Sequence, residues 1–223
     1  YRQLALSRVA DMPDGGKVII SMPLVPYRCP PGPYERASLI ANYLKKHKPK
    51  SKVILLDANA DVVAKKPLFM KAWSTYYKGI FEYIPGKKVT AVDVANRTLL
   101  VEGIEEFKGD VVNFIPPQRA AAIAAKAGLV GEDKKWCPVN VTTFESTLQK
   151  NIHVIGDSAI AGAMPKSGYS ANSQAKVCAI NLVALMNGKE LTELSGINVC
   201  YSAISDHESI SVAGVYAVKE GKI

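Results

Sequence analysis

Two short apolar runs lie on either side of a segment with helical periodicity. The runs are Lys17–Ser21 and Val53–Asp57, and both are rich in Val, Ile and Leu. Continuous apolar strands of this kind are typical of a parallel sheet that is covered on both faces. Between them, apolar side chains recur at helical spacing from Ala37 to Leu44. The pattern predicts a β-α-β unit.

The next segments extend this unit. Apolar periodicity predicts a helix at Leu68–Lys78 and then a hairpin of two strands, Val89–Val94 and Thr98–Val101, with Asn96-Arg97 at the turn. The run Asp110–Ile115 has strand character again and is expected to return to the sheet. Together these elements predict a three-layer α/β domain.

A different pattern follows the last of these strands. We expect an alanine-rich helix at Gln118–Ala127, a strand at Asn151–Asp157 and a long helix at Ala171–Met186. Gly188 lies just beyond that helix, where a C-terminal glycine cap is common. The segment Ile197–Val218 alternates small and β-branched residues and predicts two strands joined around residues 206–208.

Composition and charge narrow the class of protein. The chain has 223 residues, of which 48% are hydrophobic and 22% charged, as in ordinary globular proteins. Its net charge of +8 favours anionic ligands or acidic partners, but the lysines are dispersed and no nucleic-acid module accompanies them. No apolar run approaches the roughly 20 residues that span a bilayer, and no signal peptide heads the chain.

The loop after the first strand, Tyr27–Arg36, is the most informative stretch. At this junction a dinucleotide-binding unit carries glycines, which let the backbone close on a pyrophosphate. Here Pro30, Pro31 and Pro33 stiffen the loop instead, and it presents the thiol of Cys29. Asp57 ends the second strand, where a Rossmann acid would hold a ribose. Without a glycine fingerprint we interpret that acid as a remnant and expect no nicotinamide nucleotide.

The four cysteines differ in setting. They show no C-x-x-C spacing, so a zinc site is not expected. Cys178 lies in an apolar helical pattern and Cys137 between Trp and Pro, and we interpret both as structural. Cys29 and Cys200 lie in polar or turn-like segments and are the plausible redox couple.

Several runs resemble one known family, in the same order over nearly the whole chain. The chain is similar to the flavoprotein subunit of flavocytochrome c sulfide dehydrogenase. The runs that carry this resemblance are Arg28–Ser38, Ile115–Ala120, Trp136–Val139, Ile152–Asp157, Met164–Gln174 and Cys200–Ser202. The resemblance implies a flavin-linked oxidoreductase with the glutathione-reductase-like FAD/NAD(P)-binding fold.

The resemblance also implies a domain organisation. Residues 1–16 correspond to the end of a helix of the FAD domain and a linker, and residues 17–130 to the central pseudo-NAD-binding α/β domain. Residues 131–190 correspond to the later part of the FAD domain, and residues 191–223 to the start of the interface domain. No G-x-G-x-x-G motif occurs and no cysteine precedes Cys29. We therefore expect a fragment that lacks the first half of the FAD domain and its covalent flavin tether.

By resemblance, FAD is the cofactor and two short segments hold it. Gly156-Asp157 would contact the ribityl chain, since glycine allows close approach and the carboxylate accepts a hydroxyl hydrogen bond. Ser167-Gly168-Tyr169 would place a helix N-terminus where its partial positive charge stabilises an anionic flavin. Lys166 could add a full charge there. The alternative interpretation of this segment is a capped surface helix.

The resemblance assigns the chemistry to sulfur. The matching cysteines, Cys29 and Cys200, form a disulfide over the flavin, and sulfide attacks one of the two sulfur atoms. Glu35 is a candidate acid/base by the same resemblance, although a first-turn acid is also favoured by the helix dipole alone. The partner implied is a c-type cytochrome subunit, and the location is the periplasm.

Two other functions stay open. The chain could be a non-catalytic module that docks to a cytochrome subunit, which predicts binding without turnover. It could also be a relative of sulfide:quinone oxidoreductase, although the amphipathic membrane-binding C-terminus of that family is not seen. A Ser/His/Asp hydrolase is excluded, because Asp206 and His207 have no nucleophile elbow to accompany them.

Overall fold

A four-stranded parallel sheet forms the centre of the first part of the chain in the computed structural model. The structure describes residues 2–103, 105–193, 195–219 and 222–223, and side chains from Ser7 onward. The sheet has the strand order β3-β2-β1-β7. Its strands are β1 (Lys17–Met22), β2 (Lys52–Asp57), β3 (Phe81–Ile84) and β7 (Val111–Phe114). All three pairings in it are parallel, as the apolar runs predicted.

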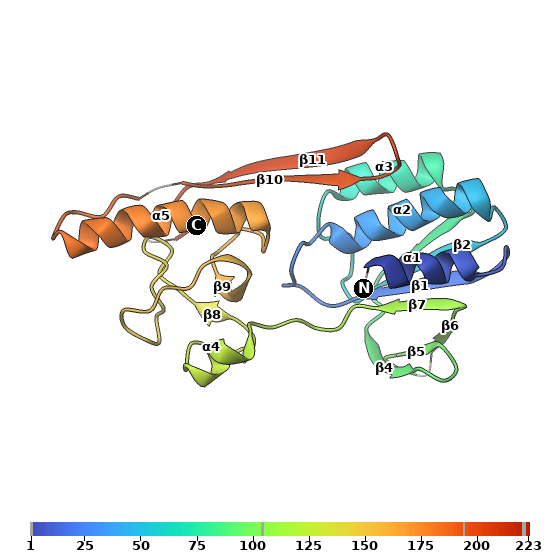
Figure 1. Ribbon diagram of the computed structural model, residues 1–223, viewed down its shortest axis with the longest axis horizontal. Coiled ribbons are helices and arrows are strands. Elements are labelled where there is room, and N and C mark those ends of the chain that lie inside the picture. Colours follow the sequence, from blue (N-terminus) through green and yellow to red (C-terminus); the bar gives the residue numbers. More distant parts are fainter. Residues whose placement is uncertain (1, 104, 194, 220–221) are drawn as a thin grey trace. The chain divides into compact units, whose positions relative to one another are not determined.

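Helices cover one face of this sheet. Helix α2 (Gly32–His47) packs on β1 and β2, and α3 (Lys66–Tyr76) lies on the same side (Figure 1). A further helix, α1 (Arg2–Asp11), precedes β1. Five of the six residues of β1 and of β2 are buried, because alternate side chains point into two different layers.

A small antiparallel sheet covers the other face. It consists of β4 (Val89–Asp93), β5 (Thr98–Val101) and β6 (Glu106–Lys108). Leu99 and Val101 pack against Ile19, Ile54 and Leu56 of the parallel sheet. The predicted hairpin and the three-layer arrangement are thus confirmed, while β3 and β6 were not predicted.

The second part of the chain has fewer regular elements and two small cores. Its elements are α4 (Ala122–Lys126), β8 (Cys137–Pro138), the 3-10 turn η1 (Gly156–Ser158), β9 (Ala159–Ile160) and α5 (Gly168–Met186). One core gathers Phe144, Met164 and Val177 with their neighbours, and the other is built around Trp136. Strands β8 and β9 pair in parallel.

Two predicted elements were wrong in this part. The strand at residues 151–157 is replaced by an isolated bridge at His153 and the turn η1. Asn151 has φ of 63° and Gly156 has φ of 72°, and neither value is compatible with an extended strand. The alanine-rich helix is only the short α4, since the chain remains extended after two prolines. Helix α5 was predicted correctly, and Gly188, with φ of 60°, ends it.

A hairpin of β10 (Gly196–Ala203) and β11 (Ser209–Tyr216) follows, as predicted. The chain divides into two compact units. The first comprises Tyr1–Val25, Pro30–Pro117 and Tyr201–Ser211, and the second comprises Pro26–Cys29, Gln118–Cys200 and Val212–Ile223. Within the described ranges no helix combines the length and apolar character that crossing a membrane requires.

Candidate functional site

The loop that presents Cys29 is held by hydrogen bonds from two of its backbone N–H groups within the second unit. The Arg28 N–H donates to Gln118 Oε1 at 2.8 Å, and the Cys29 N–H donates to the carbonyl of Lys166 at 2.8 Å. Cys29 is exposed and has φ of 52°, a left-handed conformation that is rare for a residue with a Cβ. Such a conformation persists only where surrounding contacts impose it, and it is common at functional sites.

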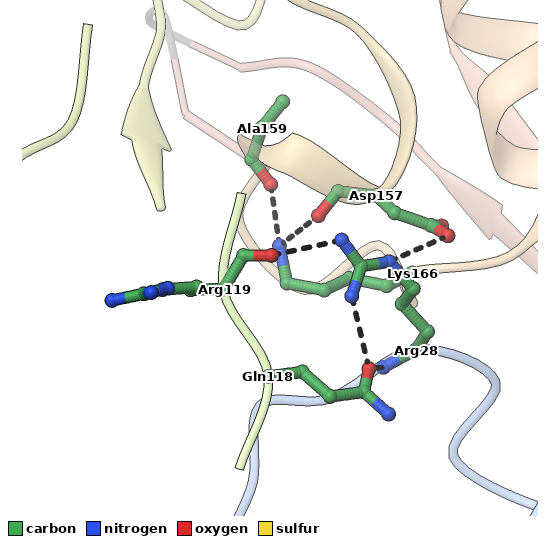
Figure 2. Close-up of polar contacts among 6 residues, drawn as sticks. All are labelled: Arg28, Gln118, Arg119, Asp157, Ala159 and Lys166. Carbon is green, nitrogen blue, oxygen red and sulfur yellow. Dashed lines mark hydrogen bonds and ion pairs between the residues drawn. The ribbon is translucent and has the colours of Figure 1, made fainter. Parts of the chain in front are cut away.

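The Arg28 side chain makes further contacts around this loop. Its Nη1 donates to Gln118 Oε1 at 3.3 Å and its Nη2 to the carbonyl of Arg119 at 2.9 Å. Its Nε lies 3.5 Å from Asp157 Oδ2, which makes an ion pair (Figure 2). The residue next to Cys29 is therefore bonded to the acid that the sequence predicted to contact the flavin.

Lys166 is directed onto backbone carbonyls. Its Nζ donates to the carbonyls of Asp157 and Ala159, each at 2.8 Å (Figure 2). The same Nζ lies 3.9 Å from the centroid of the Trp136 ring, within cation–π distance. Burial lowers the pKa of Lys166 to about 8, against the opposing effect of the Asp157 carboxylate. The predicted interaction of this ammonium with a flavin stays a prediction.

The ring of Trp136 packs against the charged groups of both Arg28 and Lys166. It is 1% exposed, and the Arg28 guanidinium carbon lies 5.5 Å from its ring centroid. Its indole Nε1 is buried and has no hydrogen-bond partner among the described residues. A buried donor of this kind is costly unless another group satisfies it.

At the N-terminus of α5, a side chain caps one backbone N–H, while the first two residues of the helix are exposed. The Ser167 Oγ accepts the N–H of Ser170 at 3.1 Å and donates to Asn198 Oδ1 at 2.6 Å. Gly168 and Tyr169 precede the first hydrogen bond within the helix, and both are exposed. A Cβ added to Gly168 would meet nothing within 4 Å. The positive end of this 19-residue helix is thus accessible to an anionic group.

Gly156 places Asp157 close to this helix. Its N–H donates to Gln174 Oε1 of α5 at 2.7 Å, and a Cβ added to it would lie 3.2 Å from the Ala171 Cβ. With φ of 72° as well, the position suits glycine. The Asp157 side chain is 36% exposed, so its carboxylate remains accessible although it pairs with Arg28.

These features fit a cofactor that carries hydroxyl groups and negative charge. The exposed carboxylate of Asp157 suits a hydroxyl donor, and the open N–H groups at Gly168 and Tyr169 suit an anionic edge. A bound group would also find space beside Gly168. The residues predicted to bind FAD therefore suit that group.

The other predicted catalytic residues lie on different elements. Cys200 is half-buried in β10 and belongs to the same unit as Cys29. Glu35 lies in the first turn of α2, and its Oε1 accepts the N–H of Ala203 at 3.1 Å. Cys137 and Cys178 are buried in the two cores, as predicted, and burial raises the pKa of each thiol.

Asp57 has a structural role. Its carboxylate is fully buried and accepts hydrogen bonds from the Tyr34 hydroxyl at 2.8 Å and the Tyr83 hydroxyl at 2.9 Å. The backbone and side-chain nitrogens of Asn59 donate to it at 2.8 and 2.7 Å. These four donors engage the carboxylate that would hold a ribose in a dinucleotide-binding domain.

Sequence reasoning gave no role to three residues of this site, namely Arg28, Gln118 and Trp136. The position of Arg28 directly before Cys29 is a signal that could have identified it as a site residue. No local signal identifies Gln118, whose contact with Arg28 spans 90 residues.

Two family models match parts of this chain. Residues 3–116 match the family model of the central region of the sulfide dehydrogenase [flavocytochrome c] flavoprotein chain. Residues 193–223 match the model of the flavin-binding region of flavocytochrome c sulphide dehydrogenase, which confirms the predicted cofactor, FAD.

Two solved structures show the same fold. The sulfide:quinone oxidoreductase of Aquifex aeolicus has 17% identity and a TM-score of 0.74, over 95% of this chain and 57% of that one. A chain in the mitochondrial ATP synthase of Tetrahymena thermophila has 16% identity and a TM-score of 0.75, over 97% of this chain and 55% of that one. The present chain thus spans little more than half the length of either. The match to the sulfide:quinone oxidoreductase structure confirms the predicted fold class.

Proposed function

The chain belongs to the family of the flavoprotein chain of flavocytochrome c sulfide dehydrogenase, and we propose that it takes part in FAD-dependent oxidation of sulfide. In this proposal Cys29 and Cys200 are the redox pair and a c-type cytochrome receives the electrons. The flavoprotein acts in the periplasm.

One observation carries the proposal. The exposed thiol of Cys29 lies on a loop that is bonded directly to the segment predicted to contact the flavin. Arg28 pairs with Asp157, and the Cys29 N–H donates to Lys166 just before the α5 N-terminus. A reactive sulfur and a cofactor must be held in fixed relation for electron transfer between them, and these contacts supply such a relation.

The proposed chemistry begins with a disulfide between Cys29 and Cys200. A hydrosulfide ion attacks one of the two sulfur atoms, forms a new S–S bond and breaks the bond between the cysteines. The bonding electron pair leaves with the other cysteine, as a thiolate. FAD, when bound, would supply the acceptor for two electrons. Their loss would let the thiolate sulfur re-form the Cys29–Cys200 bond, while the outer sulfur of the persulfide would leave at the zero-valent level and its proton would be released. Glu35 is the candidate for moving the proton that hydrogen sulfide loses, as the resemblance implied.

The remaining residues of the site bind and orient. Asp157 accepts a hydrogen bond from a hydroxyl of the cofactor. The N–H groups of Gly168 and Tyr169 stabilise negative charge at the end of α5. Ser167 keeps this helix terminus in place through its bonds with Ser170 and Asn198.

Single substitutions of the two cysteines test the proposal. In the flavin-loaded protein, we expect Cys29→Ser and Cys200→Ser each to lower the rate of sulfide-dependent flavin reduction by at least about 100-fold, since a nucleophilic pair acts as a unit. Cys178→Ala, a buried cysteine outside the site, is the matched control and should retain the rate. Unchanged reduction in both serine variants would contradict the proposal.

The electron acceptor needs a separate measurement. The sulfide-reduced protein is mixed with oxidised cytochrome c or with a soluble quinone, and flavin reoxidation is followed. We expect fast reoxidation by cytochrome c. Exclusive reaction with quinone would favour a sulfide:quinone oxidoreductase, whose fold the chain shares. Binding of cytochrome without any sulfide-dependent reduction would favour a docking module.

A further inference from the structure

Lys166 is bonded at both of its ends to functionally different segments. Its backbone carbonyl accepts the Cys29 N–H at 2.8 Å. Its side-chain ammonium donates to the carbonyls of Asp157 and Ala159, each at 2.8 Å. One residue therefore connects the cysteine loop with the segment that carries the predicted flavin ligand. Figure 2 shows the two bonds that its ammonium makes to this segment.

The surroundings make this connection stiff. The ammonium lies over the buried Trp136 ring at 3.9 Å and is only partly accessible to water. If the ammonium were removed, two carbonyls would lose their donor at a partly buried position, where replacement by water is incomplete. Arg28 forms a second connection in parallel, from the residue before Cys29 to the Asp157 carboxylate at 3.5 Å.

We propose that Lys166 is a positioning residue that couples the Cys29 loop to residues 157–159, so that a flavin ordering one segment also orders the other. This inference rests on the proposed function, because it takes Asp157 as a flavin contact. In this inference Lys166 holds two protein segments together, whereas the sequence predicted that its charge lies beside the flavin. The left-handed backbone of Cys29 is then maintained by the cofactor segment through Lys166.

Amide hydrogen exchange of residues 26–33 measures this coupling directly. Pro26, Pro30, Pro31 and Pro33 have no N–H, so the signal comes from a few amides. Among these amides, that of Cys29 bonds to Lys166 and that of Arg28 to Gln118. A peptide covering this stretch therefore reports on the two bonds that hold the loop.

The variant Lys166→Met removes the ammonium and keeps much of the aliphatic stem. Without flavin, we expect the peptide 26–33 to exchange at least about tenfold faster in this variant than in the wild type. Peptides from β1 and β2 should be unchanged, which separates local loosening from global unfolding. Lys176→Met, which alters an exposed lysine of α5, is the control and should match the wild type. Equal exchange in Lys166→Met and wild type would overturn the coupling.

A second measurement uses saturating FAD, and its wild-type part does not depend on a folded variant. In the wild type, FAD should slow exchange of the peptide 26–33 at least about fivefold, and in Lys166→Met this protection should be lost. If FAD binds, as judged by quenching of its fluorescence, but the wild-type peptide is not protected, the inference is wrong. If FAD does not bind the wild type at all, the proposed function fails instead. The flavin-free comparison still decides whether Lys166 couples the two segments.

Discussion

Asp57 and Asp157 are the two acids that the sequence predicted at strand ends, and their environments in the structure differ sharply. Asp57 ends β2 in the first unit, is fully buried and accepts hydrogen bonds from Tyr34, Tyr83 and twice from Asn59. Asp157 lies in the turn η1 of the second unit, is 36% exposed and pairs with Arg28.

The difference shows how to tell a structural acid from one that serves a ligand. The Asp57 carboxylate is satisfied entirely by donors of its own unit. Two of these donors are the hydroxyls of Tyr34, which is buried, and Tyr83, which is partly buried, and both rings pack against Trp73. The Asp157 carboxylate keeps an accessible side beside a helix N-terminus. The first unit has the parallel sheet of a nucleotide-binding domain, but its acid, Asp57, already accepts hydrogen bonds from the protein. The second unit is irregular, and its acid, Asp157, can still accept a hydrogen bond from a ligand.

Removing Asp57 should have the largest effect. Asp57→Ala leaves two hydroxyls and the Asn59 nitrogens without their acceptor in the interior, and each unsatisfied buried group costs about 1–3 kcal/mol. We therefore expect the free energy of unfolding to fall by about 3–5 kcal/mol, as measured by urea denaturation. Asp157→Ala is the counterpart and should cost less than about 1 kcal/mol, since exposed ion pairs contribute little. A larger loss of unfolding free energy in Asp157→Ala than in Asp57→Ala would contradict the interpretation of Asp57 as the structural acid.

Gly156→Ala should have an intermediate effect. The position has φ of 72°, and the added methyl would lie 3.2 Å from the Ala171 Cβ. We expect a loss of about 1–3 kcal/mol in unfolding free energy. Gly188→Ala is the matched control, since φ is 60° there but an added Cβ meets nothing within 4 Å. The difference between the two variants measures the close approach of η1 to α5, and equal losses would mean that this approach adds nothing.

The smallest effect concerns pH. Burial lowers the pKa of Lys166 to about 8 from its ordinary 10.5, so between these values the unfolded chain binds more protons than the folded one. This lysine therefore makes stability rise with pH across that window, an effect that Lys166→Met abolishes. We expect the difference between wild type and variant to change by less than about 1 kcal/mol from about pH 7.5 to about pH 9.5, since solvent screens a half-exposed charge.

Other groups do not obscure this difference. Burial raises the pKa of Cys137 and Cys178, which lowers stability as pH rises past their ordinary value of 9.0. The contribution of Cys178 is the same in wild type and variant and therefore cancels. That of Cys137 differs, because the Lys166 ammonium lowers its pKa, but it acts only above pH 9.0, at the upper end of the window. Tyr77, with its pKa raised to about 12, acts only above pH 10.0. A difference that stays constant over the window would show that Lys166 does not titrate there.

The sequence predicted the first unit better than the second. Strands β1, β2 and β7 and helix α2 were predicted because doubly buried strands and amphipathic helices leave periodic patterns in the chain. Strand β3 was not predicted, since Phe81–Ile84 is too short and too mixed in polarity to be distinctive. The predicted strand at residues 151–157 was wrong because left-handed residues at Asn151 and Gly156 interrupt it.

The site shows the same limit. Cys29, Asp157 and Lys166 were identified through a family resemblance, but their mutual contacts were not. The bonds of Arg28 to Gln118 and Asp157, and of Cys29 to Lys166, join segments that only the fold brings together. No periodicity encodes such long-range contacts.

Equilibrium titration with FAD tests the central claim most directly, namely that the accessible acid beside α5 binds the cofactor. A hydrogen bond to a charged group contributes about 1.5–3 kcal/mol, so Asp157→Ala should weaken FAD binding by about 10–100-fold. The control Glu190→Ala alters an exposed acid of the same unit and should bind FAD as the wild type does. FAD affinity that is the same in Asp157→Ala, Glu190→Ala and wild type would contradict the account.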